Sequence, residues 1–347
     1  MTATRPAAST VPQHLNGSVQ SWHSQITEDG PFLPEKDRYH LYIGLFCPFA
    51  HRVNIVRQLY GLQDLLPLSV VKPYPKGDDK GWPGWQFPSS DAEYPEATVD
   101  HVFSSKYLHE VYFRADPEYE GRYSVPLLWD KKTNAIVNNE SAEMLRWLPH
   151  AFDSLTGRGL KKDVELYPED LRPKIDQVTE WMHRDLNKGV YKAGFATSQE
   201  DYDKNVIPVF AALNRLEKLI ASNGGPFILG ERLTELDMTA YVTIVRFDTV
   251  YVQHFKCNLG TIRHDYPQIN GWLTRLYSRV PAFKETTNFK HIKENYTKSH
   301  YDINPRAITP RGPWPDVERD EGKSVKETRT GGVLMPEVLE AEKKLPA

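Results

Sequence analysis

The stretch Tyr39–Tyr60, YHLYIGLFCPFAHRVNIVRQLY, decides the fold of the first half of the chain. Residues 39–46 are mostly apolar or aromatic, and Leu41, Ile43 and Leu45 occupy every second position, which predicts a β-strand. Apolar residues then recur at helical spacing at Val53, Val56 and Tyr60. The stretch therefore predicts a strand that runs directly into a helix.

Cys47 lies at the junction between this strand and helix, just before Pro48. Pro suits the first helical position, so the sulfur is expected at a helix N-terminus, where free N–H groups and the helix dipole favour an anion. We therefore expect a depressed pKa and a thiolate nucleophile at Cys47. The alternative is a buried cysteine that acts as a small apolar side chain. Ala50 stands where a dithiol motif would carry its second cysteine, so any disulfide of Cys47 needs an external thiol.

Composition narrows the class of protein. The 347 residues predict two domains. The 43 basic and 46 acidic residues form no basic block, so we expect no nucleic-acid or membrane partner. No apolar run reaches membrane-spanning length, and two cysteines far apart suit a reducing compartment. We predict a cytoplasmic protein, although an acid-free start with one Arg leaves a weak mitochondrial transit peptide open.

The order of the predicted strands and helices divides the chain into five segments. Predicted strands and helices alternate up to residue 150, and Pro126 interrupts one of the strands (Tyr123–Trp129). After residue 162 the apolar residues follow only helical periodicity. The segments are an irregular N-terminal arm (1–38), an α/β domain (39–150) with an aromatic-rich insert (72–100), a linker (151–162), an all-helical domain (163–300) and an extended C-terminal tail (301–347).

The chain resembles the Xi-class glutathione transferases, the S-glutathionyl-hydroquinone reductases. The segments that carry the resemblance are CPFAHR (47–52), GWQF (84–87), ADPEYEGRYSVPLLWDKKTNAIVNNESAEMLR (115–146), GVYKAGFATSQE (189–200), VRFDTVYVQHFKC (245–257) and HIKENYTKSHYDINP (291–305). The resemblance implies a thioredoxin-like N-terminal domain, an all-helical substrate-binding domain, glutathione as co-substrate and a homodimer. The family motif is CPWAHR, so Phe49 replaces a Trp, and we expect adjusted packing there.

The resemblance also implies a glutathione site at the helix starts of the first domain. Cys47 would meet the sulfur, and Val125, before an expected cis Pro126, would offer its backbone N–H and C=O. Glu140 would hold the γ-glutamyl ammonium and Ser141 its carboxylate at a helix N-terminus. The alternative for the Glu140-Ser141 pair is an ordinary helix cap.

Two further glutathione contacts are implied. The match to GWQF selects Trp85 over Trp82 as the contact residue of the insert. Arg122 would bind a carboxylate, and its alternative is a solvated loop charge.

The resemblance assigns Tyr191, Tyr251 and Tyr296 to the electrophile site. Phenolic hydroxyls can hydrogen-bond a quinol oxygen or donate a proton to the departing ring carbon. Their alternative is a role as core tyrosines, since the chain has 18 Tyr. His254 and Cys257 lie three residues apart, but two ligands are too few, and we expect no metal.

The predicted activity is deglutathionylation of S-glutathionyl-hydroquinones through a mixed disulfide on Cys47. One alternative is an Omega-like thioltransferase or dehydroascorbate reductase, against which GVYKAGFA and HIKENY argue. Another is a non-catalytic ligandin for aromatic compounds. Turnover of a glutathionyl-quinol separates an enzyme from a ligandin.

Overall fold

A computed structural model describes residues 22–77, 84–156, 164–312 and 336–345. Trp82, half of the predicted linker and much of the predicted tail lie outside these residues. The chain forms two compact units, one of Met1–Lys161 with Thr286–Ser299 and one of Lys162–Glu285 with His300–Ala347. The first unit thus includes a segment from the end of the predicted helical domain.

The first unit is built on a mixed sheet with the strand order β2-β1-β3-β4. Its strands are β1 (Tyr39–Ile43), β2 (Leu68–Val70), β3 (Leu127–Asp130) and β4 (Ala135–Asn138). Strand β1 pairs in parallel with β2, with Leu41 opposite Leu68, and antiparallel with β3. Every residue of β1 is buried, as expected for the apolar run in a central strand.

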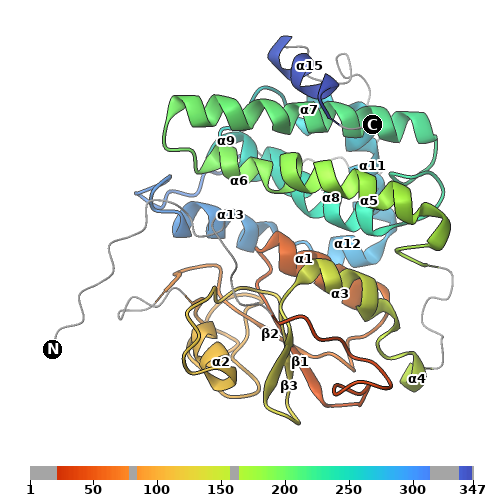
Figure 1. The fold of residues 1–347 in the computed structure, drawn as a ribbon. Helices are drawn as coiled ribbons and strands as arrows, with labels where there is room; N and C mark the ends of the chain where they lie inside the picture. Colours follow the sequence, from red (N-terminus) through yellow and green to blue (C-terminus); the bar gives the residue numbers. More distant parts are fainter. Residues whose placement is uncertain (1–21, 78–83, 157–163, 313–335, 346–347) are drawn as a thin grey trace. The chain divides into compact units, whose positions relative to one another are not determined.

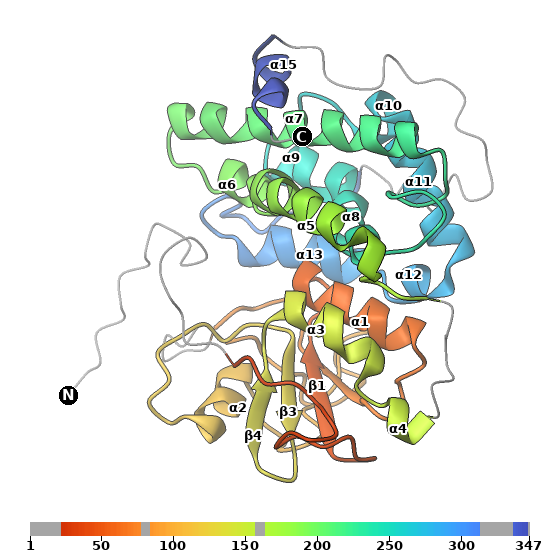
Figure 2. The same ribbon diagram turned by 45° about the vertical axis from the view of Figure 1, so that its right-hand side comes forward.

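Helices surround this sheet in the first unit. They are α1 (Pro48–Leu59), α2 (Leu108–Ala115), α3 (Ser141–Trp147), the short 3-10 turn η2 (Leu148–His150), α4 (Asp153–Thr156) and α13 (Phe289–Ser299). Helices α1 and α3 pack side by side, which both ribbon views show (Figures 1 and 2). The starts of these two helices follow the ends of β1 and β4, respectively.

The described part of the N-terminal arm covers the edge of the sheet. The Ser24 N–H donates to the Val137 carbonyl at 3.0 Å, and the Asn139 N–H donates to the Trp22 carbonyl at 3.2 Å. The Trp22 ring packs edge-on against Tyr112, with centroids 5.8 Å apart. The arm therefore satisfies edge groups of β4 that would otherwise be open to another strand.

The described parts of the second unit are helical. Its elements are η3 (Glu169–Leu171), α5 (Arg172–Trp181), η4 (Met182–Asn187), α6 (Gly189–Gly194), α7 (Gln199–Asn223), α8 (Glu235–Arg246), η5 (Phe247–Tyr251), α9 (Val252–His254), α10 (Ile262–Asp265), α11 (Pro267–Arg279), α12 (Pro281–Glu285) and α15 (Pro336–Lys343). Segments η4 and η5 are π-helical. The predicted fold class, a thioredoxin-like domain followed by an all-helical domain, is confirmed.

The sequence predicts a helix that starts at Ser198-x-x-Asp201 and stops at Asn223-Gly224-Gly225, and α7 begins and ends there. Ser198 is its N-cap, and the Ser198 hydroxyl accepts a hydrogen bond from the Asp201 N–H at 3.1 Å. Gly224 follows the last helical residue with φ 66°, a left-handed conformation that Gly adopts without steric cost.

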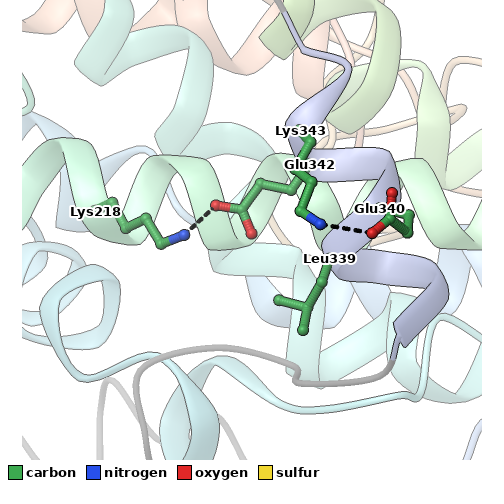
Figure 3. A pocket seen from close by; sticks show the side chains of 5 residues that line it. All are labelled: Lys218, Leu339, Glu340, Glu342 and Lys343. Atoms are coloured by element: carbon green, nitrogen blue, oxygen red, sulfur yellow. Dashed lines mark hydrogen bonds and ion pairs between the residues drawn. The ribbon is translucent and has the colours of Figure 1, made fainter.

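Helix α15 corrects the expectation of a wholly extended tail. Val338 is fully buried, and Glu342 binds Lys218 and Asn214 of α7. A pocket lined by Lys218, Leu339, Glu340, Glu342 and Lys343 lies at this contact (Figure 3). The mostly polar composition of this segment did not predict a helix, because only Val338 and the paired Glu342 mark the side of α15 that packs on α7.

None of the described helices combines the length and the apolar character that a membrane crossing requires.

Asp237 anchors the start of α8. Its carboxylate accepts hydrogen bonds from the Ile228 N–H at 3.0 Å, the Thr234 N–H at 2.9 Å and the Trp272 indole at 2.9 Å. Asp237→Ala should lower the free energy of unfolding by about 3–5 kcal/mol, because it leaves several buried donors without an acceptor. Urea unfolding measures the loss. The exposed Asp203→Ala should stay within about 0.5 kcal/mol of wild type, and equal losses would contradict the assigned role.

Candidate active site

Cys47 lies at the N-cap of α1, and Pro48 occupies the first helical position. Its backbone is extended, with φ −76° and ψ 123°, and its side chain is half-buried. The Cys47 N–H donates to the Gly44 carbonyl at 2.9 Å, and the Cys47 carbonyl accepts the N–H of His51 at 2.9 Å. The thiol is therefore held at the positive end of α1, where a thiolate is stabilised.

Val125 is a hydrogen-bond partner of the Cys47 thiol. The thiol donates to the Val125 carbonyl, with the sulfur and oxygen 3.4 Å apart. The Val125–Pro126 peptide bond is cis. Within the part of the chain that the structure describes, the Val125 N–H makes no hydrogen bond. One backbone donor beside the thiol is thus open to a ligand.

Ser141 is the first residue of α3, and it is linked to α1 by Arg52. The Arg52 guanidinium donates to the Ser141 hydroxyl oxygen from Nε at 3.0 Å and from Nη2 at 2.6 Å. Both residues are buried, and the guanidinium carbon lies 5.4 Å from the Phe49 ring centroid. A buried cation beside a helix N-terminus attracts a carboxylate.

Glu140 and Arg122 lie near this helix start. Glu140 is the N-cap of α3, and its backbone N–H donates to the Asn138 side chain at 2.7 Å. Burial lowers the pKa of Arg122, against opposing effects of Tyr119 and Glu140. The Arg122 Nε is buried and finds no partner among the described residues. This guanidinium is therefore not an ordinary solvated charge, and it retains a donor for a ligand.

Trp85 packs on Phe46, the residue that precedes Cys47. Its half-buried ring lies 4.5 Å from the ring of Phe46, and the Lys76 ammonium lies 5.4 Å from the Trp85 ring centroid. The Trp85 carbonyl accepts the N–H of Leu108 at 2.8 Å, at the start of α2. The insert thus places an aromatic side chain close to Cys47.

Tyr191 and Tyr251 are brought together in the second unit. Their rings meet edge to face, with centroids 6.1 Å apart. Phe255 packs against both, at 5.1 Å from Tyr191 and 5.4 Å from Tyr251. Tyr251 ends the π-helical η5, and Tyr191 follows the π-helical η4. Such π-helical turns occur often at functional sites.

Two histidines extend this aromatic cluster. His254 Nε2 and His300 Nδ1 are 3.1 Å apart, and the His300 ring stacks on Phe255. Burial lowers the pKa of His254 to about 4, so His254 is neutral at pH 7. No group of three or more metal-ligating side chains occurs among the described residues.

Tyr296 belongs to α13, in the first unit. It is buried, with 2% of its surface exposed. The structure therefore places one of the three predicted tyrosines in the same unit as Cys47 and the other two in the second unit.

Sequence reasoning assigned no role to Arg52 and His51, although both belong to CPFAHR. His51 Nε2 lies 3.1 Å from the Thr286 hydroxyl oxygen, and this contact joins α1 to the segment before α13. The available signal was their place in the CPFAHR motif, in the first turns of the helix that follows the candidate nucleophile.

The two cysteines differ in environment, and this difference predicts their reactivity. Burial raises the pKa of Cys257 to about 12, so this thiol stays protonated at pH 7. Iodoacetamide should therefore label the native protein once, at Cys47, and label Cys257 only after denaturation. Peptide mass spectrometry gives the assignment. Native labelling at Cys257 before Cys47 would remove Cys47 as the candidate nucleophile.

Two domain models of known families match the chain. The model of the glutathione S-transferase N-terminal domain matches residues 46–151, and that of the glutathione S-transferase C-terminal domain matches residues 199–275. The first match includes Cys47, Val125 and Ser141.

Individual relatives are similar over most of their length. Glutathione S-transferase omega-like 2 of Schizosaccharomyces pombe is 53% identical, over 86% of this chain and 93% of the relative. Glutathionyl-hydroquinone reductase YqjG of Escherichia coli is 45% identical, over 86% of this chain and 87% of the relative. The crystal structure of the Xi glutathione transferase ECM4 of Saccharomyces cerevisiae in complex with glutathione has a TM-score of 0.81 and 38% identity, over 87% of this chain and 98% of that chain. With both domain models matched and relatives this similar, the chain belongs to the glutathione transferase family and, within it, to the Xi class.

Proposed function

We propose that this enzyme reduces S-glutathionyl-hydroquinones with glutathione through a mixed disulfide on Cys47. The observation that carries the proposal is the half-exposed Cys47 thiol at the N-terminus of α1, 3.4 Å from the Val125 carbonyl. The names of YqjG, a glutathionyl-hydroquinone reductase, and of the glutathione-bound ECM4 structure support the choice of substrate.

In the first half-reaction the Cys47 thiolate attacks the glutathionyl sulfur. A sulfur–sulfur bond forms, and the bond between sulfur and ring carbon breaks. The electron pair of that bond goes to the ring carbon, which takes up a proton and leaves as the hydroquinone. The enzyme is left with glutathione in a disulfide on Cys47.

In the second half-reaction the thiolate of another glutathione attacks this disulfide. Oxidised glutathione leaves, and the Cys47 thiolate is restored. The sum converts one glutathionyl-hydroquinone and one glutathione into one hydroquinone and one oxidised glutathione. Ala50 in place of a second cysteine suits this route, because the resolving thiol has to come from outside.

The remaining side chains of the first unit supply the glutathione contacts in this proposal. The open Val125 N–H binds the backbone of the tripeptide, next to its sulfur. Ser141, supported by Arg52, receives the γ-glutamyl carboxylate, and Glu140 receives the ammonium. The unpaired Nε of Arg122 supports a role for Arg122 in carboxylate binding.

Trp85 completes the glutathione pocket in this proposal. Its packing on Phe46, the neighbour of Cys47, supports a side-chain contact with glutathione.

Tyr191, Tyr251 and Tyr296 act on the quinol. A carbon group leaves poorly unless charge moves onto the ring oxygens and a proton arrives, and phenolic hydroxyls can assist with both. The edge-to-face pair of Tyr191 and Tyr251 supports a role in framing a flat ring.

A second candidate is an Omega-like thioltransferase, favoured by the name of the relative that is 53% identical. It would use Cys47 in the same way but act on mixed disulfides or dehydroascorbate. A homodimer and a cytoplasmic location stay predictions from the resemblance and the composition.

Substitution of each cysteine tests the nucleophile. Cys47→Ser should abolish release of menadiol from glutathionyl-menadiol, because no other thiol can form the mixed disulfide. Cys257→Ser is the matched control and should keep most of the activity, since Cys257 is buried. Product chromatography with glutathione as co-substrate measures both. An inactive Cys257→Ser beside an active Cys47→Ser would refute the assignment.

Intact mass gives a second readout of the same thiol. Treatment with oxidised glutathione should add one glutathionyl group at Cys47, and conjugation of chlorodinitrobenzene should be weak. Transferases that conjugate activate glutathione's own thiolate, whereas a cysteine forms a disulfide with it. Strong conjugation without an adduct would count against the reaction proposed here.

Tyr→Phe substitutions test the role of the three tyrosines. Acid–base assistance is worth about 10²–10⁴-fold, so the triple variant should lose activity of this order with glutathionyl-menadiol. Reduction of a small glutathione mixed disulfide should be largely spared, since a thiolate leaves without help. Tyr202→Phe is a control, because its hydroxyl donates to the Lys256 carbonyl outside the proposed site. Equal losses on both substrates would show that the tyrosines serve only the fold.

A further inference from the structure

Helix α13 is fastened to the aromatic-rich insert, residues 72–100, by contacts within the first unit. The Asn295 side chain donates to the Pro73 carbonyl at 2.8 Å, and His291 Nε2 lies 2.7 Å from the Pro95 carbonyl oxygen. Both partners on the insert are backbone carbonyls of prolines. The two contacts fix α13 at two points of the insert far apart in sequence.

Two tyrosines of the insert add side-chain contacts. The Tyr94 hydroxyl donates to the Glu294 carboxylate, and the Lys298 ammonium donates to the Tyr74 hydroxyl at 3.1 Å. The same ammonium lies 4.3 Å from the Tyr74 ring centroid and 3.4 Å from Glu294. We call Tyr74, Tyr94, Glu294 and Lys298, with the two proline carbonyls and their partners, the α13 clamp.

The clamp holds one face of α13. Positions 291, 294, 295 and 298 follow the spacing i, i+3, i+4 and i+7, which lies along one side of a helix. Tyr296 follows Asn295 and is therefore turned about 100° around the helix axis from it. Contacts on the clamped face thus set both the position of α13 and its rotation, and so the direction of the Tyr296 side chain.

The middle of the same insert contacts the residue that precedes the nucleophile. Its Trp85 ring packs on Phe46, the residue before Cys47, and its Lys72 pairs with Glu93 at 2.5 Å, which ties the two sides of the insert together. The His51 contact with Thr286 gives a second connection between α1 and the segment that leads into α13. Contacts of the insert therefore extend both to Phe46, beside Cys47, and to the helix that carries Tyr296.

We propose that the insert, through the α13 clamp, positions the Tyr296 hydroxyl for proton delivery to the leaving quinol. This inference rests on the proposed function. Tyr94, Glu294 and Lys298 are positioning residues in it and touch no substrate. Proton transfer requires hydrogen-bond reach, and a displacement of about 1 Å costs up to about 10²-fold in rate. Thiol–disulfide exchange at Cys47 needs no such proton, so the clamp serves one half-reaction only.

Tyr94→Phe and Lys298→Met test the clamp in the full-length chain. Tyr94→Phe removes the hydroxyl bound to Glu294 but keeps the ring, which packs on His291 with centroids 5.0 Å apart. Each variant should lower kcat for glutathionyl-menadiol by about 3–10-fold and leave KM for glutathione unchanged. Reduction of a small glutathione mixed disulfide should stay within about 2-fold of wild type. Equal losses on both substrates would overturn the inference.

Tyr39→Phe is the matched control. Its hydroxyl also donates a hydrogen bond in the first unit, to the Leu33 carbonyl at 2.6 Å, but away from the insert. Any cost of Tyr39→Phe should fall on both substrates alike. A loss confined to glutathionyl-menadiol in this control would overturn the inference, because selectivity would then not depend on the clamp.

A double-mutant cycle separates this inference from the proposed function. If the clamp acts through Tyr296, Tyr94→Phe should cost nothing further in a Tyr296→Phe background. If the activity losses of Tyr94→Phe and Tyr296→Phe add up in the double variant, the inference is overturned. It is also overturned if Tyr296→Phe is slow while Tyr94→Phe alone is fully active. Neither result contradicts the proposed role of the tyrosines. A fully active Tyr296→Phe instead refutes the role of Tyr296 itself and, with it, the inference.

Hydrogen exchange supplies a readout independent of activity. Amides 292–299 should exchange several-fold faster in Tyr94→Phe than in wild type, while those of α1 and α3 should not change. Unchanged exchange in α13 would overturn the inference.

Discussion

The candidate site depends on one buried interaction, the double hydrogen bond from the Arg52 guanidinium to the Ser141 hydroxyl oxygen. A guanidinium in a protein interior is costly unless its donors are satisfied, so this contact constrains how α1 and α3 pack. Helix α1 starts at Cys47 and α3 at Ser141, and both starts favour an anion. In the proposed function, Arg52 holds the two starts together so that the glutathionyl sulfur meets Cys47 while the γ-glutamyl carboxylate meets Ser141.

Arg52 also gives a role to the aromatic side chain at position 49. The Arg52 guanidinium lies over the Phe49 ring, so the ring covers a face of the cation that hydrogen bonds in its plane leave open. Phe supplies this face, as the Trp of the family motif would, with a smaller π-system. In this chain Phe49 lies over the guanidinium while Arg52 keeps both bonds to Ser141.

The predicted difference in reactivity between the two cysteines rests on where they lie in the fold. Cys47 is half-buried at a helix start beside a backbone carbonyl, whereas Cys257 is fully buried with a raised pKa. Both were visible in the sequence, but only the tertiary structure shows that Cys257 is buried. The aromatic insert is a similar case, because its Pro and Tyr residues predict a loop with contacts and do not say that the contacts are to α13.

The sequence by itself determined the fold class, the strand-to-helix junction at Cys47, the capping of α7 and the class of the chain, because these follow from local periodicity and from motifs in order. The sequence pattern predicts a helix from Val102 to Phe113, but α2 begins at Leu108, because the Asp100 carboxylate accepts the N–H groups of Val102 and Ser105 and holds these residues in a turn. It also missed the bond from Arg52 to Ser141, the docking of α15 on α7 and the place of α13 in the first unit. Only the tertiary structure decided these, because each is a contact between segments far apart in the chain, and local periodicity carries no information about which distant group satisfies a buried charge or carbonyl.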